Sequence, residues 1–474
     1  MLNFLETTMA ALAAGLTSVV FFKVEFLGVG VPLIVLWLVM GAVFCTVYFN
    51  FINIRGFATA VKLLTHKPKY KDGVAGEITH FQALTTAVSG TVGIGNIAGV
   101  AVAISLGGAG AAFWLAVAGF LGMSTKFCEC TLSTLYRQNH DDATVAGGPM
   151  FYLQEGLAKI GRPKLGNAMA KFYALCMVIG CFGIGNMFQS NQAAVILTSQ
   201  LGESNFAYSN ILVGLVLAVT IGLVIIGGLK SIASVTSRLV PVMLVIYLVL
   251  VVIVLGLNYS LVDDAFALIF SEAFTANGVS GGVIGAMIIG FQRAVFSNEA
   301  GLGSAGIAHA AAKTDEPVTQ GMVALLEPFI DSVVVCTMTA LVIVILVILP
   351  GEATSGISGI EMSIRAFDTA IPGSSPLLAI IATLFAFSTM LAWSYYGLIA
   401  LEYLVGRSER SSMIFRLTFL FFIVVGSAIN LQSVIDISDA LVFLISIPNL
   451  IGLYLLAPEV KRELALFQQR YANS

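Results

Sequence analysis

The chain has 474 residues, of which 58% are hydrophobic and only 10% are charged, and its formal net charge is −3. Soluble domains carry about 25% charged residues, so this composition excludes an ordinary soluble protein. The slight acidity excludes a nucleic-acid partner held by a basic surface. Apolar runs of 18 residues or more recur along the chain, and each is long enough to cross a lipid bilayer as a helix. Composition alone therefore predicts an all-α polytopic membrane protein.

Eleven membrane-spanning segments are predicted after an apolar N-terminal stretch that lacks a basic n-region and is interpreted as an interfacial helix. The spans are about Gly28–Phe51, Phe81–Leu106, Ala109–Leu135, Ala168–Gln200, Tyr208–Gly228, Ile232–Leu257, Val279–Ala310, Gln320–Leu349, Leu377–Leu404, Ile414–Leu431 and Ser438–Ala457. The predicted units are residues 1–54 (interfacial helix and an extra span), 55–80 (basic cytoplasmic loop), 81–257 (five spans), 278–457 (five spans) and 458–474 (cytoplasmic tail).

Basic residues are distributed unevenly between alternate loops. Of the 23 Lys and Arg residues, 18 fall in one set of loops, and only Lys23 and Arg365 fall in the other; the remaining three lie within spans. Loops rich in Lys and Arg stay in the cytoplasm. We therefore expect a multi-pass protein of a bacterial-type plasma (inner) membrane, with its N-terminus outside and its C-terminus in the cytoplasm.

The ten spans after the first divide into two groups of five that begin on opposite sides of the membrane, as an inverted repeat requires. The opening span of each group is interrupted by glycines, in the runs Gly90–Asn96 and Ser297–Gly303. Each glycine costs about 1 kcal/mol of helix propensity against alanine. Small residues also allow close helix packing, which is the alternative to a break. Interrupted helices at matching positions of two halves predict a transporter whose binding site lies at the breaks.

Three strings carry a more specific signal: Thr91–Val100 (TVGIGNIAGV), Gly147–Tyr152 (GGPMFY) and Ser297–Gly303 (SNEAGLG). Together they resemble the alanine or glycine:cation symporter family, which includes sodium:alanine symporters. The resemblance runs from about Phe81 to beyond Trp393. It implies a LeuT-type fold, with a 5+5 inverted repeat plus one extra N-terminal span, and sodium-coupled uptake of small neutral amino acids such as alanine and glycine by alternating access.

The residues by themselves leave open a proton- or sodium-coupled carrier of another small solute on the same fold. The sequence contains no Walker, metalloprotease or Ser-His-Asp pattern, so we expect no enzyme activity and no cofactor beyond a coupling sodium ion. The oligomeric state is not predicted.

The substrate site is predicted at the first break. Backbone N–H groups at the N-terminus of a half-helix bind a carboxylate; Ile94, Gly95 and Asn96 are placed for this, and the resemblance adds Gly93. Gln189 and Gln192 are alternative acceptors for the ammonium group, and the sequence does not separate them. The other predicted substrate residues are Thr389 and Trp393, which share a helix face, together with Phe188 and Phe291.

The resemblance also implies ligands for sodium, which prefers hard oxygen atoms. One ion would be bound by the Thr91 carbonyl and the Asn96 side chain. A second would be bound by the carbonyls of Ser89 and Val92 and by the hydroxyls of Ser388 and Thr389. Serine and threonine often bond to their own helix backbone in membranes, which is the alternative for the two hydroxyls.

Charged residues within the predicted spans are expensive and favour structural pairing over a substrate role. We expect Lys126 to pair with Glu129, three residues further on the same helix, and Arg293 to pair with Glu299. Glu327 and Asp331 share a helix face, so they require a basic partner, water or a proton.

Overall fold

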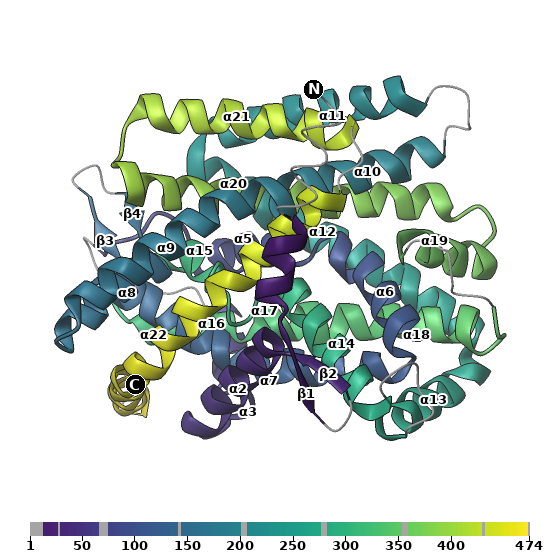
Figure 1. The fold of residues 1–474 in the computed structure, drawn as a ribbon, viewed down its shortest axis with the longest axis horizontal. Coiled ribbons are helices and arrows are strands. Elements are labelled where there is room, and N and C mark those ends of the chain that lie inside the picture. Colours follow the sequence, from purple (N-terminus) through teal and green to yellow (C-terminus); the bar gives the residue numbers. More distant parts are fainter. Residues whose placement is uncertain are drawn as a thin grey trace.

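A computed structural model describes residues 13–26, 29–65, 74–140, 144–200, 206–275, 282–352, 359–428 and 432–472 (Figure 1). Two short antiparallel hairpins accompany the helices: β1 (Lys23–Phe26) with β2 (Val29–Pro32), and β3 (Gln138–Asn139) with β4 (Val145–Ala146). The helices are α2 (Leu33–Tyr48), α3 (Ile52–Arg55), α4 (Phe57–Thr65), α5 (His80–Thr91), α6 (Ala98–Gly107), α7 (Gly110–Leu135), α8 (Pro149–Lys159), α9 (Pro163–Phe182), α10 (Phe188–Ser199), α11 (Phe206–Ile225), α12 (Gly228–Leu257), α13 (Val262–Phe274), α14 (Gly282–Asn298), α15 (Ala305–Ala310), α16 (Pro317–Ala324), α17 (Leu326–Pro328), α18 (Thr337–Ile343), α19 (Gly359–Ala370), α20 (Ser375–Val405), α21 (Glu409–Ala428) and α22 (Gln432–Ala472).

Within the described residues, eight helices are long and apolar enough to span a membrane, or ten if two bent helix pairs each count as one span. The bent pairs are α2 with residues 52–65, at 61°, and α5 with residues 94–107, at 63°. The predicted span Val279–Ala310 consists of α14 and α15, separated by Glu299–Ser304, and part of it lies outside the described residues. The helical membrane fold is therefore confirmed, while the count of eleven stays a prediction.

The helices differ in how much of their surface is covered by protein. About a third of the most apolar window of α11, α12 and α21 is buried, against 72% for α20 and 67% for α7. The helices α11 and α21 lie side by side at the edge of the bundle (Figure 1). The exposed side chains of α11 are large and apolar, as a lipid-facing surface requires. The buried helices α7 and α20 form the centre against which the broken helices pack.

The break after α5 follows from its sequence. The helix begins with a capping box between Thr79 and Gln82, which satisfies free N–H groups at its start. It ends at Thr91, because the backbone of Val92 and Gly93 is extended. A 3-10 turn at Ile94–Asn96 then leads into α6. The glycine run therefore breaks the helix rather than only easing its packing.

The second break, between α14 and α15, depends on left-handed backbone. Glu299, Gly301 and Gly303 have φ of 56°, 93° and 77°, a region that glycine enters without steric cost. This confirms the second predicted interruption.

Candidate functional site

A small cavity lies where the two breaks meet α20 and the junction of α9 and α10. The volume of the cavity is about 10 Å³. That is room for about one water molecule. The lining residues are Gly90, Thr91, Gly93, Gly95, Ile184, Gln189, Phe296, Glu299, Thr389 and Trp393.

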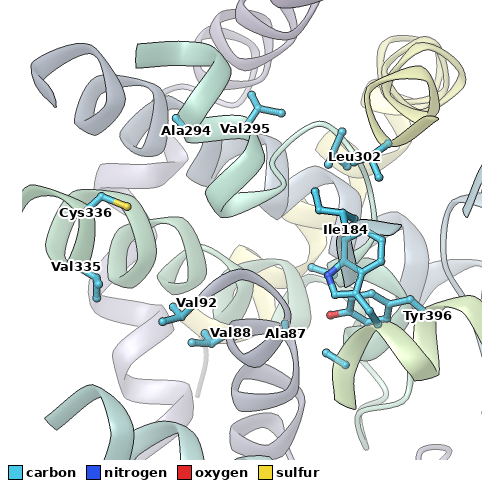
Figure 2. Packing of buried hydrophobic residues seen from close by; sticks show 14 of the residues in the cluster. Ala87, Val88, Val92, Ile184, Ala294, Val295, Leu302, Val335, Cys336 and Tyr396 are labelled. Atoms are coloured by element: carbon cyan, nitrogen blue, oxygen red, sulfur yellow. The ribbon is translucent and has the colours of Figure 1, made fainter. Parts of the chain in front are cut away.

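Apolar side chains enclose the region around the first break. Figure 2 shows Val88 and Val92 at the end of α5, with Ile184, Leu302 and Tyr396 contributed by other segments. These residues are all buried. Polar groups that face the cavity are therefore held in a water-poor environment, where an unpaired one is costly.

Six residues predicted for the substrate or the ions line this cavity, and they come from three separate stretches of the chain. They are Thr91, Gly93, Gly95, Gln189, Thr389 and Trp393. Eight other predicted residues do not line it: Ser89, Val92, Ile94, Asn96, Phe188, Gln192, Phe291 and Ser388.

Gly93 is the point at which these stretches meet. A Cβ atom at Gly93 would lie 2.7 Å from Thr389 Oγ1 and 3.6 Å from Gln189 Oε1. Any side chain at this position would therefore fill the cavity. The Gly93 N–H donates to Asn96 Oδ1 at 2.9 Å, while the N–H groups of Ile94 and Gly95 lie at the start of the turn, where a helix has no partner of its own to offer.

Gln189 and Gln192 are separated by the structure. Gln189 is buried, and its Nε2 donates to the Ile184 carbonyl at 3.2 Å, in a π-helical turn over Gly183–Met187. Gln189 Oε1 has no hydrogen-bond partner within the described part of the chain. Gln192 is half-buried and donates to Asn191 instead, at 3.3 Å. Of these two glutamines, only Gln189 offers a buried acceptor to the cavity.

Trp393 closes one side of the cavity. Its indole N–H donates to Glu299 Oε1 at 3.1 Å, and the Ser304 hydroxyl donates to Glu299 Oε2. The prediction that Arg293 pairs with Glu299 is therefore wrong; Arg293 interacts electrostatically with Asp439 of α22 instead. The left-handed backbone at Glu299 directs its carboxylate to α20, and residue spacing along the chain gave no indication of this.

Asn96 belongs to a polar cluster beside the cavity. Its Nδ2 donates to Asp331 Oδ1 at 2.5 Å. The same carboxylate accepts from Ser297 Oγ at 2.8 Å and from Ser332 Oγ at 2.7 Å. Asp331 is fully buried, and none of the ion pairs among the described residues includes it. A buried carboxylate with no cationic side chain beside it is suited to a bound cation.

The predicted pairing of Lys126 with Glu129 is also wrong. Lys126 Nζ lies 2.9 Å from Glu327 Oε1, and both side chains are fully buried. Glu129 accepts from the Gly301 N–H at 2.9 Å and from Asn449 Nδ2 at 2.7 Å. The helix α7 packs between α17 and the loop after α14. Lys126 therefore pairs with a residue of α17, and Glu129 bonds to a residue of the loop, rather than the two pairing with each other along α7.

The hydroxyls predicted for the second ion bond to their own helix. Ser388 and Thr389 donate to the Phe385 carbonyl at 2.9 and 3.0 Å. The two predicted phenylalanines do not line the cavity: Phe188 packs against Phe296, which does line it, and Phe291 packs against Trp114.

Two interrupted helices that enclose a small polar cavity, within a bundle of apolar helices, define a secondary transporter. The fold resembles the crystal structure of MhsT in complex with L-phenylalanine, with a TM-score of 0.57 at 15% identity over 80% of this chain and 89% of that one. MhsT has the LeuT-type fold, so the LeuT-type fold that the family resemblance implied is confirmed.

The sequence comparisons identify the family. A family model described as the sodium:alanine symporter family matches residues 16–474. The sodium/alanine symporter AgcS of Methanococcus maripaludis is 40% identical over 93% of this chain and 95% of its own length. The amino-acid carrier protein AlsT of Bacillus subtilis is 35% identical over 87% and 84%, and the probable sodium/glutamine symporter GlnT of the same organism is 32% identical over 90% and 86%.

The chain belongs to the sodium:alanine symporter family. It is a multi-pass membrane protein that couples amino-acid symport to sodium, and it is a transporter rather than an enzyme.

Proposed function

We propose that this chain takes up small neutral amino acids, alanine and glycine in particular, and that they bind in the cavity at the first break. The observation that carries the proposal is the unpaired Gln189 Oε1, which faces Gly93 across the cavity. An ammonium group would satisfy this acceptor. The substrate carboxylate would be bound by the N–H groups of Ile94 and Gly95 at the turn. The N–H groups of Gly93 and Asn96 would join them by leaving their present acceptors, Asn96 Oδ1 and the Gly93 carbonyl.

The size of the cavity supports a small side chain. Trp393 and Phe296 border it, and Ile184 adds a third apolar wall. One methylene group in such a pocket changes discrimination by roughly 10- to 200-fold. The name of the relative GlnT concerns glutamine, so glutamine is the natural competitor to test beside alanine and glycine.

We infer that one sodium ion binds beside Asn96, where the Asp331 carboxylate lacks a cationic side chain. The Thr91 carbonyl and the Ser297 hydroxyl would add hard oxygen ligands. The second ion site, with Ser89, Val92, Ser388 and Thr389, stays part of the proposal, although the described hydroxyls of Ser388 and Thr389 bond to Phe385.

Sodium binding and substrate binding would be coupled because both would involve the same turn of the chain. Gly93 and Asn96 belong to one turn, and the Gly93 N–H donates to Asn96 Oδ1. An ion that fixes Asn96 would also fix the amides that bind the carboxylate. Sodium and substrate would then favour the same conformation, and the loaded carrier would open to the cytoplasm.

The test is counterflow in proteoliposomes with alanine, glycine and glutamine, with sodium present or absent. Gln189→Ala should weaken alanine binding roughly 10- to 150-fold, the loss expected for a hydrogen bond to a charged group. Gln192→Ala is the matched control, because Gln192 lies one helical turn away and outside the cavity, and it should behave as wild type. A larger effect of Gln192→Ala, or uptake that is independent of sodium, would refute the proposal.

A further inference from the structure

We propose that Glu299 is a specificity-determining residue: by holding the Trp393 indole in one position, it fixes the largest side chain that the cavity accepts. The inference rests on the proposed function, since it assumes that this cavity binds the amino acid. It differs from an ammonium-binding role, which a buried carboxylate in the lining would otherwise suggest.

The hydrogen bonds of Glu299 indicate a role in positioning. Its Oε1 accepts from the Trp393 indole at 3.1 Å, and its Oε2 accepts from the Ser304 hydroxyl. Each carboxylate oxygen therefore already has a donor from the protein. Among the described lining side chains, Gln189 Oε1 has no donor. Gln189 is therefore free to bind the substrate, while Glu299 holds the Trp393 indole in the wall of the cavity.

The backbone around Glu299 is fixed in a conformation that few side chains adopt. Its φ is 56°, and a residue other than glycine in this region is uncommon. The neighbouring Asn298 accepts from the Ala300 N–H at 2.9 Å and donates to Ser332 at 2.8 Å. This turn directs the carboxylate of Glu299 toward α20, where glycine or asparagine would suit the backbone better but could not reach the indole.

The indole is confined on its other side by Gly185. A Cβ atom at Gly185 would lie 2.2 Å from Trp393 Cγ, so the ring rests directly on the helix backbone. Trp393 is 1% exposed. With backbone on one face and the Glu299 hydrogen bond at its nitrogen, the ring has one position, and the width of the cavity follows from it.

Loss of the hydrogen bond should therefore widen the range of substrates. Glu299→Ala leaves the indole N–H without its acceptor and leaves empty space beside the ring. The ring can then move away from the cavity. The ratio of alanine affinity to valine affinity should fall about tenfold, which is within the range that one methylene group changes discrimination in an apolar pocket. Glycine binding should change less.

Two further variants test whether the length or the charge of the Glu299 side chain holds the indole. Glu299→Gln keeps an oxygen at the same distance and should retain the wild-type specificity. Glu299→Asp keeps the charge but is one methylene shorter, and it should broaden specificity as Glu299→Ala does. The opposite result, with Glu299→Gln broadened and Glu299→Asp unchanged, would show that charge rather than position matters and would overturn the inference.

The control is Trp114→Phe, because the Trp114 indole also donates a hydrogen bond, partly buried, to the Ala273 carbonyl at 3.1 Å, but does not line the cavity. It should leave the ratio of alanine to valine inhibition constants unchanged. All variants are measured by competition against alanine counterflow, with monodispersity in detergent checked first.

The outcomes also separate this inference from the proposed function. If Gln189→Ala has no effect on alanine, the cavity is not the substrate site and both fail. If Gln189→Ala weakens alanine but Glu299→Ala and Glu299→Asp reduce all amino acids by the same factor, Glu299 does not set the size limit, and only the inference made here fails.

Discussion

Gly185 lies against the face of the Trp393 indole, so the absence of a side chain at Gly185 determines how far the ring stands from the cavity. We expect Gly185→Ala to push the ring into the cavity, because the new methyl group would overlap Trp393 Cγ. Alanine binding should fall more than glycine binding, by roughly tenfold in the ratio. Competition in counterflow gives this ratio. Gly180→Ala on the same helix, where the nearest atom is Val442 Cγ2 at 3.3 Å, is the control, and an unchanged ratio in Gly185→Ala would contradict the assignment.

Asp331 tests the proposed ion site. Asp331→Asn removes the buried negative charge that Asn96, Ser297 and Ser332 surround. We expect the apparent sodium affinity to fall roughly 5- to 150-fold, the cost of one lost interaction in a water-poor site. The amino-acid affinity should fall with it, because coupling is reciprocal.

The measurement is amino-acid binding titrated with sodium, in wild type and in Asn96→Ala as a second variant at the same site. The exposed carboxylate of Asp263 on α13 gives the control Asp263→Asn. Binding that follows pH and not sodium in the wild type would mean that a proton is the coupling ion and that the assignment of Asp331 fails.

A junction between the two broken helices joins the start of α5 to the end of α15. The backbone of Ile78, before α5, pairs with Ala312, after α15. Arg137 donates to four carbonyls across this junction, those of Ala75, Ala310, Ala312 and Thr314. One guanidinium therefore ties the two segments together, which a lysine ammonium cannot do with the same geometry.

We expect Arg137→Lys to loosen this junction and to expose the buried side chains of α15 beside it. A single cysteine at Ala308, which is fully buried, should react with a membrane-impermeant maleimide several-fold faster in the Arg137→Lys background, in a protein whose six native cysteines are replaced. Arg162→Lys, at an exposed position, is the control. Equal rates in both backgrounds would show that the junction does not depend on Arg137.

The ion pair of Lys126 and Glu327 links α7 to α17 at full burial. Removal of one partner leaves a buried charge alone, which costs about 3–5 kcal/mol. We expect Glu327→Gln to lower the melting temperature in detergent strongly, and Lys126→Met combined with Glu327→Leu to recover much of the loss. The exposed pair of Arg365 with Glu361 is the control, since Arg365→Met should change little. Equal stability of the Glu327→Gln single variant and wild type would contradict this account.

The orientation of the whole molecule is a prediction from loop charge. Because α22 continues to Ala472, a reporter fused at Ser474 would follow a helix whose final turns carry Lys461, Arg462 and Arg470. A reporter that works only in the cytoplasm should be active there, and one that needs the outside should be silent. The reverse pattern would overturn the predicted topology.

The sequence by itself determined the class of fold and the positions of both breaks. Apolar length indicates which segments are able to cross a membrane, and glycine runs indicate where helices end, because both are local properties of the chain. The strings around Gly93 and Gly301 also sufficed to indicate the family.

Only the tertiary structure decided which side chains meet. Lys126 pairs with Glu327, 201 residues away, and not with Glu129 on its own helix. Asp331 joins Asn96, Gln189 faces the cavity while Gln192 does not, and Glu299 holds Trp393. The physical reason is that a buried polar group takes the nearest partner in space, and that partner depends on how α7, α14 and α20 pack against one another rather than on spacing within one helix.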